Sequence, residues 1–551
     1  MLKKIYRRCA EEIFRCYAIA RVTESARVTE SVRLPERIGP ALLGKLLSQV
    51  TLAGGPHSEI AALTPFTGGV LASIPAGTEA DVERAVALAR SAQPAWAARS
   101  CADRAGIFLR FHDLLLERQD EILDLIQLET GKARRHAFEE VLDTAIVSRY
   151  YAFHAQRLLR PRRRKGALPL LTKTWELRSP VGVVGFIVPW NYPLNLAITD
   201  AVGALIAGNT AVLKPDAQTS LTALWAMNLL REAGMPADVF LVVTGEGPVV
   251  GPALGERVDF LMFTGSGRTG RLVARQAAER LIGCSLELGG KNPMIVLADA
   301  DLEKAVDGAV RGCFSAAGQI CVSIERMWVQ ESIWDKFVGR FVERTKGLRL
   351  GTALDYSIEM GSLSSERQMK AVEEHVGDAL AQGAQLLAGG RRRPDLGPLF
   401  YEPTILAGVR PGMKVYAEET FGPVVSIYPF ASEAEAVEQA NASRYGLSAS
   451  IWTRDTGRGA ILARKIRAGS VNVNEAYAAT WGSVDSPIGG VKESGLRSRH
   501  GAEGVLKFTE SQTVAVQRVL PIAPLPGMDA GTYARWMTRL VRLVRRTRIL
   551  G

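Results

Sequence analysis

The pattern of apolar and polar positions predicts a series of buried strands separated by helices in the middle of the chain. Stretches with helical periodicity alternate with four short, almost continuously apolar runs, which are Val181–Val188, Asn209–Pro215, Val239–Gly245 and Val258–Gly265. Strands that are apolar along their whole length are typical of a parallel sheet with helices on both faces. We therefore expect an α/β fold.

A second series with the same pattern follows. It begins at Pro293–Asp301, and its further expected elements are a helix to Phe314, a strand at Arg326–Gln330, a helix from Ser332 and strands around Val424 and Ser448. The chain thus has two α/β halves, and the changeover lies near Glu287.

The pattern before these series predicts a hairpin and helices. Leu63–Gly77 is expected to form a short hairpin with Gly68 and Gly69 at the turn. Thr78 can cap a helix, and a longer helical pattern runs over Asp103–Thr130. The first 60 residues look accessory and contain a tandem duplication, RVTESA followed at once by RVTESV.

Composition narrows the class of protein. A chain of 551 residues is too long for one hydrophobic core, so we expect two or three domains. An apolar content of 47% and a charged content of 23% exclude a disordered or fibrous protein. Six cysteines without a CxxC pair predict neither a disulfide framework nor a metal site. Sparse cysteine fits a reducing compartment, so we expect a cytoplasmic protein with a thiol free to react.

No segment has the pattern of a secretory signal or a membrane span. Charged residues such as Glu11 and Arg15 interrupt the apolar character of Met1–Ala20. The most apolar stretch, Val181–Leu213, contains polar residues such as Asp200 that would be costly in lipid. We interpret this stretch as buried strand, loop and helix.

The formal net charge of +11 comes from local patches. Basic residues crowd between Arg157 and Lys165, and the tail after Gln517 carries seven arginines against the single acid Asp529. These clusters lack the interleaved aromatic residues of a nucleic-acid surface, so no nucleic-acid partner is expected.

The basic tail contains a predicted amphipathic helix. Four arginines fall on one helical face near several large apolar residues; the residues are Arg535, Arg539, Arg542, Arg546, Trp536, Leu540, Leu543 and Val544. This helix could lie on a membrane surface. The commoner arrangement for an amphipathic helix is packing against protein, here the oligomer.

Two segments at strand ends have residues suited to binding a dinucleotide and an oxyanion. Gly265, Gly267 and Gly270 match GxGxxG between a strand and a helix, where backbone N–H groups can meet a pyrophosphate. In PWNYP, residues 189–193, Asn191 offers an amide donor on a loop fixed by two prolines. Taken alone, each segment is equally explained as an ordinary turn.

Three further segments carry reactive side chains. Glu287 in LELGGKNP has an apolar setting that can raise the pKa of a carboxyl and make it a base near neutral pH. Cys321 in AGQICVS follows a helix and can act as a nucleophile. Glu419 and Phe421 in EETFGPVV could hold a ribose. A buried paired glutamate, an inert cysteine and a simple turn are the alternatives for single motifs.

Together these segments, in this order, resemble the signatures of the aldehyde dehydrogenase superfamily. PWNYP, KPDAQ, FTGS, LELGGK, GQIC, EETFGPVV and SPIGGVKESGL carry the resemblance, which covers about Leu63–Val514. Within that superfamily the chain is most similar to the NADP-dependent succinate-semialdehyde dehydrogenases of the actinobacterial type. The resemblance implies oxidation of an aldehyde to the acid through a cysteine thiohemiacetal and thioester.

The resemblance also implies roles for single residues. Cys321 would be the nucleophile, Glu287 the base, and Asn191 with the Cys321 N–H the oxyanion donors. Lys214 would bond the adenosine ribose, Gly265 and Ser266 would lie near the pyrophosphate, and Glu419 would hold the nicotinamide ribose. The full expected cofactor-binding set is Trp190, Asn191, Lys214, Pro215, Asp216, Ala217, Gly265, Ser266, Leu288, Glu419 and Phe421.

Three departures from the family pattern bear on specificity. Ala217 replaces a glutamate that NAD-preferring members carry three positions after the matching lysine, so we expect NADP to be preferred and NAD to be possible. Ser315 and Thr199 stand where succinate-semialdehyde enzymes place arginines that hold the substrate carboxylate. Ser323 replaces a second, regulatory cysteine of some relatives. The substrate is therefore succinate semialdehyde or a less polar aliphatic or aromatic aldehyde.

The resemblance implies a Rossmann-like cofactor domain, an α/β catalytic domain and a small β-hairpin element that pairs subunits into a homodimer or homotetramer. We expect the divisions 1–60 (accessory extension), 61–159 with 181–286 (NAD(P)-binding), 287–502 (catalytic), 160–180 with 503–517 (oligomerisation) and 518–551 (basic tail). Two other functions are possible for this fold: a catalytically idle scaffold, or an enzyme that transfers the acyl group of the thioester to CoA. Intact Cys321, Glu287 and Asn191 argue against the scaffold, and Glu287 favours water as acceptor.

Overall fold

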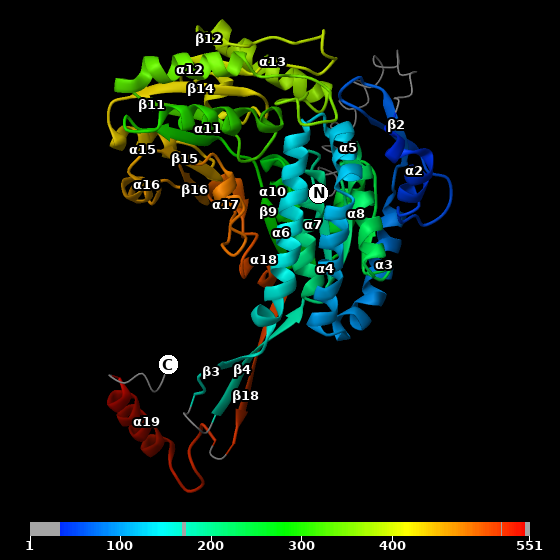
Figure 1. Ribbon diagram of the computed structural model, residues 1–551. Coiled ribbons are helices and arrows are strands. Elements are labelled where there is room, and N and C mark those ends of the chain that lie inside the picture. The colour runs from blue at the N-terminus through cyan, green and yellow to red at the C-terminus, as the bar shows by residue number, and fades with distance from the viewer. Residues whose placement is uncertain (1–33, 168–171, 519–520, 546–551) are drawn as a thin grey trace, which may run out of the picture.

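A six-stranded sheet organises the first half of the chain in a computed structural model that describes residues 34–167, 172–518 and 521–545 (Figure 1). Its parallel strands are β5 (Val183–Ile187), β6 (Thr210–Lys214), β7 (Phe240–Val242), β8 (Phe260–Thr264) and β9 (Gly283–Glu287). The strand order is β17-β9-β8-β5-β6-β7. The four strands predicted from apolar runs are confirmed. The antiparallel edge strand β17 (Gly495–Leu496) comes from much later in the chain and was not predicted.

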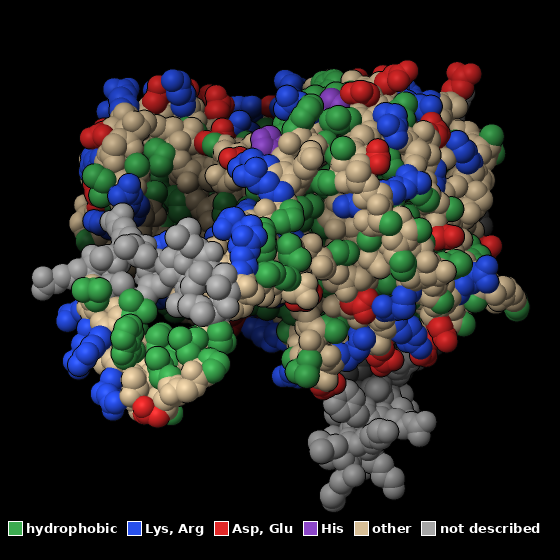
Figure 2. Space-filling view, turned by 90° about the horizontal axis from the view of Figure 1, so that it is seen from below, with side chains coloured by type: hydrophobic (Ala, Val, Ile, Leu, Met, Phe, Trp, Pro, Cys, Tyr) green, Lys and Arg blue, Asp and Glu red, His purple; other side chains and the backbone are tan. Residues whose placement is uncertain are grey.

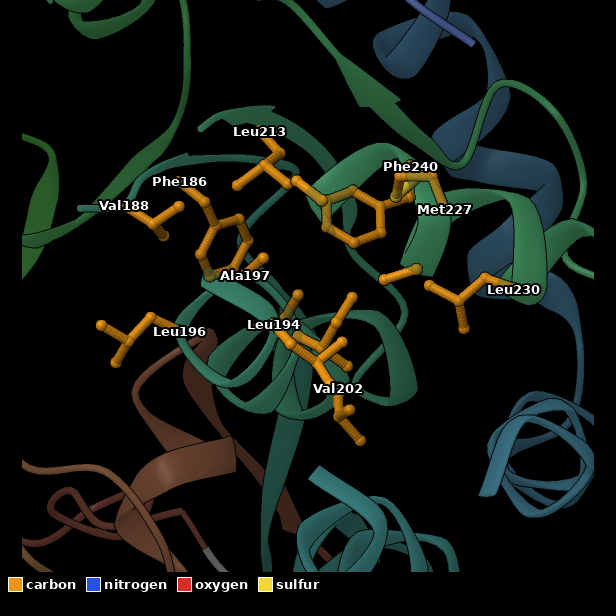
Figure 3. Close-up of a cluster of buried hydrophobic side chains, with 14 of the residues drawn as sticks. Phe186, Val188, Leu194, Leu196, Ala197, Val202, Leu213, Met227, Leu230 and Phe240 are labelled. Carbon is orange, nitrogen blue, oxygen red and sulfur yellow. The ribbon is translucent and has the colours of Figure 1, made fainter. Parts of the chain in front are cut away.

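Helices between these strands cover the sheet, namely α7 (Pro193–Ile206), α8 (Ser220–Glu232), α9 (Gly247–Gly255) and α10 (Gly267–Glu279). Every residue of α7 is buried, because this helix packs between the sheet and the helices outside it. Figure 3 shows Leu194, Ala197 and Val202 of α7 in the same buried cluster as Phe186 and Leu213 of the sheet. The stretch Val181–Leu213 is thus buried strand, loop and helix, as expected.

The helices before the sheet differ in one place from the prediction. Thr78 caps α3 (Glu79–Ala98) in a capping box with Asp81, as expected. The long helical pattern, however, is two helices, α4 (Cys101–Glu117) and α5 (Gln119–Thr130), because Arg118 leaves helical geometry at φ −105° and ψ 23°. α6 (Arg134–Leu159) follows.

The described part of the expected accessory segment packs into the main core. It forms a short turn of helix η1 (Glu36–Ile38) and helix α2 (Pro40–Leu47). Ile38, Leu46 and Val50 are buried in the same cluster as the sheet. The predicted hairpin follows as β1 (Glu59–Leu63) and β2 (Val70–Pro75). The tandem duplication lies outside the described residues.

A seven-stranded sheet organises the second half. Its strands are β10 (Asn292–Val296), β11 (Ile324–Gln330), β12 (Gln385–Ala388), β13 (Thr404–Ala407), β14 (Val424–Phe430), β15 (Ser448–Trp452) and β16 (Ser470–Val473). The order is β12-β13-β14-β11-β10-β15-β16, and only β12 runs antiparallel to its neighbour. The helices are α11 (Leu302–Phe314), α12 (Trp334–Lys346), α13 (Glu366–Ala381), α14 (Lys414–Ala417), α15 (Glu433–Asn441), α16 (Thr456–Ala463) and α17 (Ala478–Trp481). The predicted second α/β series is therefore present.

A three-stranded antiparallel sheet projects from the body as an arm (Figure 1). It consists of β3 (Arg162–Arg164), β4 (Thr172–Pro180) and β18 (Thr509–Gln517), with β4 in the centre. Helix α18 (Glu503–Leu506) leads into β18, and helix α19 (Ala530–Val544) lies at the far end of the arm. Among the described residues, no helix is long and apolar enough to cross a bilayer.

Candidate active site

The predicted cofactor residues meet at one edge of the first sheet. The chain runs outward from β5 through β6 to β7 and then returns to β8 on the other side of β5. In open α/β sheets the crevice at such a reversal, outside the carboxyl ends of the strands, is where ligands bind. The loops after β5, β6, β8 and β9 hold Asn191, Lys214–Ala217, Gly265–Ser266 and Glu287–Leu288, so four distant segments converge there.

A buried ion pair fixes the loop of Asn191. The Lys132 ammonium donates to Oε1 of Glu140 and to the Asn191 carbonyl, both at 2.6 Å. The other Glu140 oxygen accepts the backbone N–H groups of Leu194 and Asn195 at the start of α7. The Asn191 amide is buried and donates to the Gln319 carbonyl at 3.1 Å. An amide nitrogen has two N–H groups, so one donor remains for a ligand.

Backbone contacts hold the loop of Cys321 in place. The Asn292 amide donates to the carbonyls of Cys321 and Ser323, each at 2.8 Å. The turn before it is strained, because Ala316 and Ala317 adopt φ of 49° and 55° in the left-handed region. Gly318, at φ 72°, has no space for a side chain, since a Cβ would lie 2.0 Å from the Gly422 carbonyl. These contacts fix the backbone of the loop that carries Cys321.

The Cys321 side chain is partly buried. Burial raises its pKa to about 12, while the charge of Arg499 and a backbone N–H of Cys321 itself act in the opposite direction. At neutral pH the sulfur is therefore protonated in this site, and reaction through the thiolate needs a base nearby.

Glu287 is the last residue of β9, and its carboxylate can serve as this base. Burial raises its pKa to about 7, and the charges of Arg499 and Lys507 limit the rise. The Arg499 Nε lies 3.9 Å from Oε1 of Glu287, and this oxygen has no hydrogen-bond partner among the described residues. The raised pKa that the sequence predicted for Glu287 is therefore present in the structure.

Three charged residues behind Glu287 were missed by sequence reasoning. Asp200 of α7 lies 3.1 Å from Arg499 and 3.0 Å from Lys507, and all three side chains are almost fully buried. Arg499 and Lys507 belong to the C-terminal segment, more than 200 residues after Asp200. No local spacing connects them, so only tertiary contacts could have found this cluster.

A small cavity connects the base with the thiol. Its volume is about 20 Å³, and its lining includes Glu287, Cys321, Thr264 and Arg499. A cavity of this size has room for about one water molecule. The cavity thus brings a buried carboxylate oxygen and a thiol to the same space.

A larger cavity of about 140 Å³ also reaches Cys321. Its lining includes Asn191 and otherwise mostly apolar or aromatic side chains, namely Leu142, Ile146, Tyr192, Leu196, Ile320, Tyr477, Ala478 and Trp481. The ionisable acids of the lining are Glu139 and Asp143, and no lysine or arginine is part of it. The cavity therefore offers an apolar surface with acidic side chains and no basic ones.

Glu139 is held in this cavity by two tyrosines. The Tyr192 hydroxyl donates to one carboxyl oxygen at 3.2 Å, and the Tyr477 hydroxyl lies 3.0 Å from the other. Burial raises the pKa of Glu139, and the two tyrosine hydroxyls lower it. Ser315, which stands at a position where the succinate-semialdehyde pattern has an arginine, contacts the Tyr477 hydroxyl. Thr199 bonds the Asn195 carbonyl within α7 and lies outside the cavity lining.

Gly270 and Gly289 at the sheet edge have no space for a side chain, because neighbouring groups come too close. Ser266 caps α10, so the helix begins with Gly267 at the end of β8. A Cβ on Gly270 would lie 2.5 Å from Leu288, and one on Gly289 would lie 2.1 Å from Glu419. The strand–loop–helix context expected for the glycine motif is therefore present, and the backbone comes close to its neighbours there.

A second buried ion pair fixes the loop of Glu419. Lys291 donates to Oε2 of Glu325 at 2.5 Å, and Glu325 accepts the N–H groups of Thr420 and Phe421. Glu419 accepts the Gly290 N–H at 2.7 Å, and burial raises its pKa to about 8. Phe421 packs edge-to-face on Trp190 with 5.6 Å between ring centroids. The structure thus brings the predicted Glu419, Phe421 and Trp190 to the same crevice.

Lys214 and Ala217 lie where β6 ends. The Lys214 side chain is buried, and burial lowers the pKa of its ammonium, while the charges of Asp216 and Glu246 raise it. Pro215 follows, Asp216 caps a short turn of helix, and Ala217 begins that turn. No carboxylate stands at the Ala217 position, as the sequence shows.

A Rossmann-type sheet with a thiol and a buried carboxyl at its ligand crevice is typical of dinucleotide-dependent enzymes that work through a cysteine. The family model of the aldehyde dehydrogenase family matches residues 53–514. The chain belongs to the aldehyde dehydrogenase family, as its motifs predicted.

Relatives and solved structures agree with this family. A Mycolicibacterium smegmatis protein that carries the provisional name succinate-semialdehyde dehydrogenase [NADP(+)] is 51% identical over 87% of this chain and 93% of its own length. An Escherichia coli NADP-dependent enzyme of known structure has 35% identity and a TM-score of 0.81, over 85% of this chain and 98% of that chain. Staphylococcus aureus betaine aldehyde dehydrogenase in complex with NAD+ has 32% identity and a TM-score of 0.81, over 87% and 98%.

Proposed function

We propose that this member of the family oxidises an aldehyde to the carboxylic acid with NADP, through a thioester on Cys321. The observation that carries the proposal is the water-sized cavity whose lining includes both Cys321 and Glu287. A thioester formed at that sulfur has space beside it for a hydrolytic water and a carboxylate that can take the proton of that water.

In the first half of the proposed reaction, Glu287 takes the proton of the Cys321 thiol, and the sulfur attacks the carbonyl carbon of an aldehyde in the larger cavity. Glu287 then releases this proton to solvent before the second half. The Asn191 amide and the Cys321 backbone N–H donate to the oxygen that becomes negatively charged. The Lys132–Glu140 pair supports this role, because it fixes the loop that carries Asn191. When bound, the nicotinamide supplies the hydride acceptor, and loss of hydride from the thiohemiacetal leaves the thioester.

In the second half, Glu287 deprotonates water that attacks the thioester and releases the acid. A base is most effective when its pKa lies near the working pH, and burial places the pKa of Glu287 at about 7. The small volume of the cavity favours water over a bulky acceptor such as CoA.

The residues at the sheet edge fit a dinucleotide. The pyrophosphate would lie at the start of α10 beside Gly265 and Ser266, and Lys214 would donate to the adenosine ribose. Glu419, whose pKa is raised, would hold the nicotinamide ribose. The absence of a carboxylate at Ala217 removes one charge that would repel a 2′-phosphate, and the names of the relatives also specify NADP.

We further propose that the substrate is an uncharged aldehyde with an apolar tail. The larger cavity has a mostly apolar lining that contains Glu139 and Asp143 and no cationic side chain. A substrate carboxylate would lose its hydration there without gaining a partner. Succinate semialdehyde is the second candidate, because the relatives' names specify it.

A panel of aldehydes followed by NADPH absorbance tests these proposals. Hexanal and benzaldehyde are expected to give a higher kcat/KM than succinate semialdehyde, and NADP a higher value than NAD. Cys321→Ala is the matched inactive control. A clear preference for succinate semialdehyde would reject the apolar substrate but keep the reaction, whereas activity that survives in Cys321→Ala would reject the reaction.

We also propose that the arm pairs subunits into a homodimer or homotetramer in the cytoplasm. Its outer strands β3 and β18 each have one unpaired edge among the described strands of that sheet. Exposed strand edges of this kind favour pairing with another chain. Sedimentation analysis of the purified protein is the direct test.

A further inference from the structure

Helix α19 has one apolar face and one strongly basic face. Tyr533, Trp536, Met537 and Leu540 recur at spacings of three and four residues, which places them on one side of an α-helix. Arg535, Arg539 and Arg542 recur with the same spacing on the other side. Asp529, which caps the helix by accepting the N–H of Thr532, is the nearest acid.

The apolar face is largely uncovered in the described part of the chain, because Trp536 and Leu540 are exposed and Tyr533 and Met537 are half-buried. None of the helix residues whose side chains are described is buried. Trp536, Val541 and Leu543 are exposed to 67%, 58% and 79%. Ile522 and Leu525, in the segment that leads to the helix, are exposed as well. Figure 2 shows hydrophobic side chains gathered on this projection with lysine or arginine along one side.

The charge of the helix argues for an anionic partner. From Ala530 to Arg545 the helix and its end contain four arginines and no acid. The whole chain carries a net charge of +11, so a second copy of this chain is a like-charged partner. A bilayer with anionic lipids offers both an apolar interior for the tryptophan and negative head groups for the arginines.

We propose that α19 docks this enzyme on the surface of an anionic lipid bilayer, with the helix axis in the plane of the interface. The apolar face enters the head-group boundary, and the arginines extend to the lipid phosphates. Figure 1 shows the helix at the far end of the arm, away from both sheets, so a flat surface can reach it. The inference goes beyond the catalytic proposal, because it needs neither Cys321 nor the cofactor.

Co-sedimentation of the full-length protein with vesicles tests the docking. The protein is expected to sediment with vesicles of phosphatidylcholine and phosphatidylglycerol, to bind vesicles of phosphatidylcholine alone much more weakly, and to be released by added salt. Arg535→Gln with Arg539→Gln should lower the partition coefficient by more than an order of magnitude, at about fivefold for each arginine. The double variant Trp536→Ser with Val541→Ser should not bind the anionic vesicles.

Matched controls separate docking from a general loss of charge or apolar surface. Arg464→Gln and Ile461→Ser change exposed residues at α16 in the second half of the chain and should bind as the wild type does. All variants should keep the wild-type rate with a water-soluble aldehyde. The proposal is overturned if the wild-type protein does not bind anionic vesicles, or if the α19 variants bind them as well as the wild type does. A third result also overturns the proposal: the wild type binds no vesicle, and the oligomer dissociates in the α19 variants. The helix then packs on a second copy of the chain.

Discussion

The Nε of Arg499 lies 3.9 Å from Oε1 of Glu287, and both side chains are almost fully buried. On its other side, Arg499 contacts Asp200 at 3.1 Å. A positive charge this close favours the carboxylate form of Glu287, whereas burial favours the neutral form. The pKa of about 7 is the balance of these two effects, with burial the larger.

Replacing Arg499 should therefore shift the pH dependence of the reaction. In Arg499→Met the favourable charge is lost, so the pKa of Glu287 rises. Because a base works only when deprotonated, the acid limb of the kcat/KM profile should move to higher pH by about one unit or more. Arg497→Met, an exposed neighbour, is the control. An acid limb at the wild-type position would show that Arg499 does not tune the base.

Replacing Glu287 itself should slow formation of the thioester, because the Cys321 thiol loses its base, and should block hydrolysis of the thioester that does form. Glu287→Gln keeps the size of the side chain but cannot take a proton from water. Steady-state turnover should fall by about two orders of magnitude or more. Mass spectrometry of the intact protein mixed with NADP and aldehyde should detect an acyl adduct. Cys321→Ala should form none, and a full wild-type rate in Glu287→Gln would contradict the assigned base.

A carboxylate at position 217 should change cofactor choice. In Ala217→Glu a negative charge would stand near the proposed ribose site, where it repels a 2′-phosphate and can bond a 2′-hydroxyl. The ratio of kcat/KM for NADP over NAD should fall about tenfold or more. Ala217→Gln, which is similar in size but neutral, should change the ratio much less. Equal effects of both variants would mean that charge at this position does not decide the preference.

Removing the charge of Glu139 should admit anionic aldehydes. Glu139→Gln retains the size of the side chain between Tyr192 and Tyr477. Its kcat/KM for succinate semialdehyde should rise several-fold, while that for hexanal should change little. Glu438→Gln, at an exposed position of α15, provides a charge control away from the larger cavity. If both aldehydes respond equally, Glu139 does not exclude negative charge.

The Lys132–Glu140 pair should be important for stability as well as for the loop. Lys132→Met would leave a buried carboxylate without its partner, which typically costs about 3–5 kcal/mol in the free energy of unfolding. Replacing both residues, as Lys132→Met with Glu140→Leu, removes both charges and should recover part of that loss in a denaturation experiment. The kcat should remain low in both variants, because the Asn191 carbonyl has lost its donor. Full recovery of kcat in the double variant would show that the pair does not position Asn191.

The sequence by itself determined the strands, most helices and the family. Continuously apolar runs such as Val258–Gly265 indicate strands that are buried on both faces. This pattern can be recognised from neighbouring residues alone. Arg118 was missed as a helix break, because no glycine or proline marks it and the apolar periodicity continues through it. Motifs such as LELGGK and GQIC could be recognised because their residues are neighbours in the chain.

Only the tertiary structure decided what surrounds those motifs. Asp200, Arg499 and Lys507 meet behind Glu287 from distant segments, and the charges of Arg499 and Lys507 limit the rise that burial causes in the pKa of the base. Glu139 faces the larger cavity because α6 lies beside the loops of Tyr192 and Tyr477. Electrostatic and cavity properties depend on distances in space and on exclusion of water. A linear pattern therefore predicts which side chains are present, whereas packing determines their charge state and what they can bind.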